Sequence, residues 1–135
     1  MFLNLPIQCS SNDGLNVIIT APLYFLAASG DNYMVPVGAT SDGASTPHEI
    51  WPLLPPFGVY WPAAVLHDAA YRNTLMVKRA NAGFSDWALA ALPRDRCDDL
   101  LKEAMRDLGV SEADIVEIYE GVHLCGEDSF VGDRK

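Results

Sequence analysis

The sequence predicts a single α+β domain in which a small N-terminal antiparallel β-sheet precedes a bundle of about three helices. Two observations lead to this fold class. Short β-branched and aromatic runs come first in the chain, whereas amphipathic helical patterns follow from residue 62 onward. With 135 residues, half of them apolar, the chain can bury one core. The expected parts are a β-rich region (1–37), an ordered loop (38–61), a helical region (62–125) and a tail (126–135).

Two stretches carry the strand pattern. Between Asn16 and Ala28 the apolar run is interrupted by Pro22, which indicates two short strands or one bent strand. The pattern resumes from Tyr33 to Val37. Because Pro36 lacks a ladder donor, this second stretch should lie at a sheet edge or end early.

The segment after these strands is rich in helix and strand breakers. Residues 38–62 contain three glycines and five prolines, too many for a regular element. The same segment holds tryptophan, phenylalanine, tyrosine and leucine, which should pack back on the domain. Structureless loops longer than about 12–15 residues are usually functional or disordered, and the apolar content favours a functional loop.

Residues typical of helix starts and ends mark three helices after residue 61. Pro62 suits the first position of a helix that runs to Tyr71. An amphipathic helix is expected over about Arg94 to Leu108, with Gly109 as its C-cap. The final helix should begin at Ser111, which forms a capping box with an acid three residues later.

The segment between Asn73 and Pro93 is harder to interpret. We expect a short helix over Ser85–Ala90 there, with Ser85 as its N-cap. No internal repeat or low-complexity tract accompanies it.

The charge excludes some partners. At a net charge of −9, with nine scattered lysines and arginines, the chain has no basic footprint for duplex nucleic acid, and it should be repelled by an anionic membrane surface. No apolar run approaches the roughly 18 residues of a membrane span, and the first residues lack the basic region of a signal peptide. We expect neither secretion nor membrane insertion.

The cysteines indicate a reducing compartment. Cys9, Cys97 and Cys125 are odd in number and have no C-x-x-C spacing, which argues against a disulfide framework or a cysteine-built zinc site. Free thiols in a cytoplasm fit this pattern best.

A polar cluster lies on the first predicted helix. His67 and Tyr71 are four residues apart and share a face, whereas Asp68 points about 100° away. On the second helix, the helical phase turns Asp98 toward the core and Asp99 toward solvent. A histidine with an acidic partner can act as a general base or bind a metal, so His67, Asp98 and Tyr71 are the candidate catalytic residues. The alternative is a set of satisfied polar residues where helix and loop meet.

The loop that precedes this helix supplies a candidate rim for the site. Ser41, Gly43 and Ser45 are the candidate rim residues, because Gly43 allows the backbone to approach a ligand. Asp42, together with Asp68, is a candidate ligand for a cation such as Ca²⁺. In the alternative interpretation these side chains bond their own backbone and shape the turn.

Several motifs together resemble a known family. They are Val35-Pro36-Val37-Gly38, Ser41-Asp42-Gly43-Ala44-Ser45-Thr46-Pro47, Leu54-Pro55-Pro56-Phe57-Gly58, Ala63-Ala64-Val65-Leu66-His67-Asp68 and Cys97-Asp98 followed by Ala104-Met105. In combination they resemble DUF1353, a family found largely in tailed phages and prophages, over residues 33 to 122. The resemblance implies a viral protein that is made in the host bacterial cytoplasm. It also allows that the protein is incorporated in the virion. The chain departs from the family pattern at Ala69-Ala70, where an aromatic residue often follows.

The arrangement of His67, Asp68 and a distant acid is also similar to the phospholipase A2 plan. By that analogy His67 activates water, Asp68 and carbonyls of the Gly38–Gly43 loop hold Ca²⁺, and Asp98 orients the histidine. The cysteine framework of the secreted phospholipases is absent.

Two functions follow as hypotheses. The first is a hydrolase acting on a small substrate, with His67 activating water and a cation assisting. The second is a non-enzymatic virion component, or an inhibitor or adaptor that binds a host protein, for which the acidic composition suits a basic partner.

Overall fold

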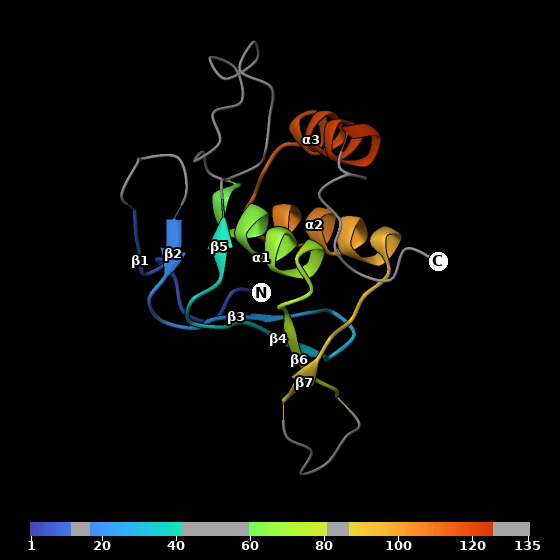
Figure 1. Ribbon diagram of the computed structural model, residues 1–135. Coiled ribbons are helices and arrows are strands. Elements are labelled where there is room, and N and C mark those ends of the chain that lie inside the picture. Colours follow the sequence, from blue (N-terminus) through green and yellow to red (C-terminus); the bar gives the residue numbers. More distant parts are fainter. Residues whose placement is uncertain (12–16, 42–59, 81–86, 126–135) are drawn as a thin grey trace.

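The computed structural model describes residues 1–11, 17–41, 60–80 and 87–125, with the backbone alone at 121–125. Within these ranges it has two antiparallel sheets and three helices, which confirms the predicted α+β class (Figure 1). None of the helices in these ranges is long and apolar enough to cross a membrane.

The larger sheet has four strands. Its order is β3 (Leu23–Leu26), β4 (Asn32–Val35), β6 (Met76–Lys78) and β7 (Ala88–Leu89). Alternate residues of β3 are buried, as expected for a sheet with one face on the core. As predicted, β4 ends before the proline that follows it, although it lies between two partners and not at an edge.

The smaller sheet has three strands. Its order is β1 (Cys9–Ser10), β2 (Val17–Ile19) and β5 (Thr40–Ser41). The stretch from Asn16 to Ala28 therefore contains two strands, β2 and β3, which belong to different sheets. β5 lies inside the range that we expected to be a loop, and its pairing with β2 fixes the backbone there.

The helices form the C-terminal layers. They are α1 (Trp61–Tyr71), α2 (Arg94–Asp107) and α3 (Glu112–Cys125). Residues 63–71 of α1 are all buried, because α1 contacts α2 on one side and strands β4 and β5 on another (Figure 1). In turn α2 packs against α3, so it lies between the other two helices.

The structure confirms where the sequence predicted that the second helix ends and the third helix begins. Gly109 follows α2 with φ +78°, and the next amide donates back to Met105 O at 3.1 Å. At the start of α3, Ser111 Oγ accepts a hydrogen bond from the Asp114 amide at 3.2 Å. Both signals are local, which is why the sequence reveals them.

The prediction of a short helix over Ser85–Ala90 is wrong. Ala88 and Leu89 form β7, which pairs with β6, and the Ala90 amide donates to Leu75 O at 2.8 Å. Alanine and leucine favour a helix, but a helix this short gains little, and pairing with an available sheet edge outweighs that preference. Residues 81–86, which include the proposed N-cap, lie outside the described ranges.

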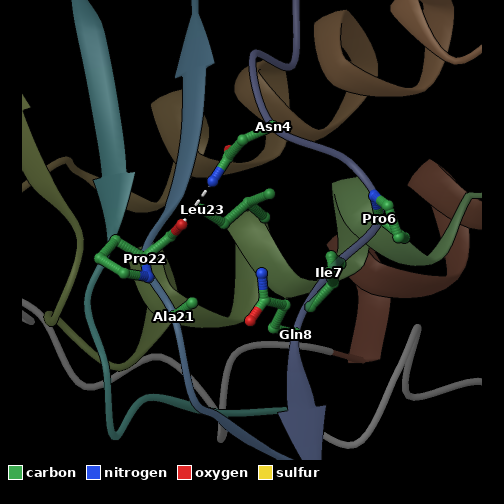
Figure 2. Close-up of a pocket in the computed structure, with 7 residues that line it drawn as sticks. All are labelled: Asn4, Pro6, Ile7, Gln8, Ala21, Pro22 and Leu23. Atoms are coloured by element: carbon green, nitrogen blue, oxygen red, sulfur yellow. Dashed lines mark hydrogen bonds between the residues drawn. The ribbon is translucent and has the colours of Figure 1, made fainter.

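A small pocket lies where the N-terminal segment crosses the start of β3 (Figure 2). Asn4 spans it, since its Nδ2 donates to Pro22 O at 2.7 Å and its Oδ1 accepts from the Tyr24 amide at 2.9 Å. No acidic, basic or thiol side chain lines this pocket. Its lining residues are Asn4, Pro6, Ile7, Gln8, Ala21, Pro22 and Leu23.

Candidate functional site

The centre of the site is a contact between α1 and α2. Nε2 of His67 lies 2.9 Å from Oδ1 of Asp98, and both side chains are buried. Asp98 is fully enclosed, whereas the side chain of its neighbour Asp99 is 50% exposed. The helical phase therefore predicted correctly which of the two acids faces the core.

Tyr71 joins this pair from one turn further along α1. Its ring lies 4.0 Å from that of His67, centroid to centroid, and its hydroxyl donates to Asp98 Oδ1 at 2.7 Å. The same hydroxyl accepts a hydrogen bond from Arg94 Nε at 3.2 Å. His67 and Tyr71 therefore converge on one carboxylate oxygen, as their shared helix face predicts.

Arg94 is a member of the site that the sequence analysis missed. It stands at the first position of α2, four residues before Asp98. An Arg and an Asp at this spacing share a helix face, which is the signal that points to it. In the structure Arg94 reaches the acid through the Tyr71 hydroxyl.

Asp68 belongs to a second contact, between α1 and β5. Ser41 Oγ donates to Asp68 Oδ2 at 2.6 Å, and both residues are buried. Arg72 holds the same strand, since its Nη1 donates to the carbonyl and the hydroxyl of Thr40. Asp68 Oδ1 lies 4.0 Å from His67 Nδ1, which is beyond hydrogen-bond range but brings the two contacts close together.

Burial sets the protonation of the cluster. It lowers the pKa of His67, and the hydrogen bond to Asp98 opposes this only in part. The pKa of Tyr71 is raised by burial and by its bond to the Asp98 carboxylate. The imidazole is therefore neutral near pH 7 and the phenol keeps its proton. With Asp98 ionised, the carboxylate can only accept, and the imidazole proton then lies on Nε2 and leaves Nδ1 as the basic nitrogen.

The remaining predicted residues divide between the described and undescribed ranges. Ser41 lies beside Asp68, whereas Asp42, Gly43 and Ser45 lie outside the described residues. Over residues 1–11, 17–41, 60–80 and 87–120, no three His, Cys, Asp or Glu side chains come together as a metal site would require. The cation site thus stays a prediction.

The fold and this cluster define a small α+β protein with a buried His-Asp-Tyr network between two helices. The model of the family DUF1353, protein of unknown function, matches residues 17–122, and the chain belongs to that family. His67, Tyr71 and Asp98, together with Arg94, all lie within the matched range. Comparisons with curated proteins and with solved structures gave no match.

Proposed function

We propose that this chain is a hydrolase in which His67 acts as the general base. The observation that carries this proposal is the 2.9 Å contact between His67 Nε2 and Asp98 Oδ1. That contact fixes the ring and the tautomer, and it leaves Nδ1 as the atom that can accept a proton. The lowered pKa of His67 supports the proposal, because only the neutral form can act as a base.

The proposed reaction is hydrolysis of a carboxylic ester. Nδ1 of His67 takes a proton from water while the water oxygen bonds to the carbonyl carbon. The C–O bond to the leaving alkoxide then breaks, and the imidazolium returns its proton to that alkoxide. Asp98 stabilises the transient imidazolium, and Tyr71 holds the Asp98 carboxylate in place.

A cation is part of this proposal. Asp68 and Asp42 are the proposed ligands, because carboxylate oxygens are of the kind that Ca²⁺ prefers, and Asp42 directly follows Ser41, which bonds to Asp68. Ca²⁺ bound there would polarise the ester carbonyl as a Lewis acid. The likeness to the phospholipase A2 plan makes phospholipid esters the first substrates to test.

The test is a hydrolase screen with ester, phospholipid, amide and phosphodiester substrates, each with and without Ca²⁺ or Zn²⁺. Wild type is compared with His67→Ala and with Asp99→Asn, a charge-removing control on the exposed side of α2. We expect turnover that His67→Ala abolishes and Asp99→Asn preserves. Turnover that is indifferent to His67→Ala would rule out His67 as the base.

Burial favours a second candidate function. The side chain of His67 is only 6% exposed and that of Asp98 is not exposed at all, which suits an internal polar lock between helices. In this candidate the chain binds a host or phage protein, and the acidic composition favours a basic partner. It predicts no turnover in the screen and a purely structural effect of His67→Ala on thermal unfolding.

Origin and location follow from the family likeness as proposals. We infer a phage or prophage protein that is made in the host bacterial cytoplasm. Detection of the chain in purified particles by mass spectrometry would distinguish a virion component from a protein left in the cell.

A further inference from the structure

The larger sheet has a second face that points away from the helices. Figure 1 shows α1, α2 and α3 on one side of this sheet, where alternate residues of β3 and β4 are buried. On the opposite side the strand register places Tyr24, Met34, Met76 and Leu89 in one row across the four strands. A sheet with one solvated face normally carries polar residues there, so an apolar row indicates a surface that is covered.

The N-terminal segment extends this row beyond β3. Phe2 forms an antiparallel bridge with Phe25, and the Leu3 amide donates to Tyr24 O at 3.0 Å. Because the Phe2 ring packs on the buried Phe25 ring, the next side chain, Leu3, points to the other side of the sheet and is 48% exposed. Leu89, at the opposite end of the row, is 46% exposed.

Trp87 adds a second aromatic ring to this surface, since its ring lies 5.8 Å from that of Tyr24, centroid to centroid. Lys78 is the charged member of the next row, beside Leu26 and Asn32. None of these side chains is acidic, although the chain has 18 acidic residues and a net charge of −9. We call the surface made by the following residues the outer face: Leu3, Tyr24, Met34, Met76, Trp87 and Leu89.

We propose that the outer face binds the outer face of a second copy of this chain, so that two sheets pack together in a two-fold dimer. The composition suits this occupant. Interfaces between identical chains are more apolar than those between unlike proteins, and aromatic residues and methionine are enriched at interfaces. Dimer formation is independent of the proposed hydrolase site, and its test requires no substrate.

Charge favours a second copy over a charged partner. A basic protein would be attracted to the exposed acids of α2 and α3, such as Asp99 and Glu112, whose side chains are 50% and 68% exposed. An acidic protein would be repelled by the net charge of −9. Two copies repel each other as well, but at the outer face they meet without opposing carboxylates.

The size of the outer face sets the strength of the dimer. The four strands and the N-terminal segment lie about 4.8 Å apart and are about five residues long, which gives a footprint of about 400 Å². A stable interface buries about 800 Å² on each partner. The dimer should therefore be reversible, with a dissociation constant in the micromolar range or weaker.

Sedimentation equilibrium over a concentration series tests whether the dimer forms. We expect wild type to pass from monomer to dimer as its concentration rises. Added NaCl should strengthen the dimer, because salt screens the repulsion between two copies with the same charge. A chain that stays monomeric up to about 1 mM, or a dimer that salt dissociates, would overturn the proposal.

Three variants test which surface is used. Leu3→Glu and Leu89→Glu each place a carboxylate on the outer face, and in a two-fold dimer each is present twice. Val116→Glu is the matched control, because Val116 is 52% exposed on α3 and its substitution adds the same charge elsewhere. We expect the dissociation constant to rise about tenfold or more in the first two variants and to stay within about twofold in the control. Equal effects in all three variants would contradict the proposal.

Methyl NMR of methionine-labelled wild type gives a test without substitutions. The methyl signals of Met34 and Met76 should shift as the protein is diluted, because both side chains belong to the outer face. Met105 is fully buried in the core and serves as the internal control. Dimerisation that leaves the Met34 and Met76 signals unchanged would assign the contact to another surface and overturn the proposal.

Discussion

Nε2 of His67 and Oδ1 of Asp98 lie 2.9 Å apart although the two residues are 31 positions apart in the chain. This contact joins α1 to α2 and gives the candidate site its geometry.

Asp98→Asn should remove the charge that orients His67 while nearly preserving the shape of the side chain. If the chain is a hydrolase, kcat should fall by about two to four orders of magnitude, as expected when a general base loses its orienting acid. Asp99→Asn is the control, since Asp99 is half exposed. Full activity in Asp98→Asn would contradict the proposed role of the pair.

The stability of the protein should depend on pH through His67. Burial lowers the pKa of His67 in the folded state below the ordinary imidazole value of 6.5, so the unfolded chain binds a proton at a pH at which the folded chain does not. This contribution is complete above about pH 6.5 and is lost as the pH falls below that value. Urea unfolding at several pH values should show a free energy of unfolding that declines more steeply from pH 7 to pH 5 in wild type than in His67→Asn. Equal slopes would show that His67 is not buried in its neutral form.

Ser41→Ala should destabilise the contact between β5 and α1. It removes the 2.6 Å hydrogen bond to Asp68 Oδ2, and the loss of a bond to a buried carboxylate costs about 1–3 kcal/mol. Ser10→Ala serves as the control, because Ser10 is an exposed residue of the same sheet. Chemical denaturation measures both, and equal stabilities would show that the Ser41 bond contributes no net stability.

Gly30→Ala should be more destabilising than Gly38→Ala. Both glycines have positive φ, +91° and +92°, so an added Cβ strains the backbone by about 1–3 kcal/mol at either site. At Gly30 the new Cβ would also lie 2.9 Å from the Cβ of Ala80, whose amide is held by Asp31 Oδ1 at 3.0 Å. At Gly38 the new Cβ would lie more than 4 Å from every heavy atom of the described residues other than its chain neighbours. Thermal unfolding should rank the variants, and a Gly38→Ala protein that is less stable than Gly30→Ala would contradict this account.

The sequence by itself determined the elements whose signals are local. Periodicity and caps predict α2 and its end at Gly109, and the capping residue Ser111 marks the start of α3. The same periodicity turns Asp98 inward and Asp99 outward, so helical phase identified which of the two acids faces the core. These features depend on neighbours within one or two turns, which a sequence displays directly.

Tertiary structure decided the rest, because it depends on which distant segments pair. Ala88 and Leu89 carry no strand pattern of their own and become β7 only because the edge of β6 accepts them. Likewise the bond from Ser41 to Asp68 requires β5 to lie along α1. The hydrogen bonds that link Arg94 to Asp98 through Tyr71 form only when the two helices pack together, because Tyr71 belongs to α1 whereas Arg94 and Asp98 belong to α2.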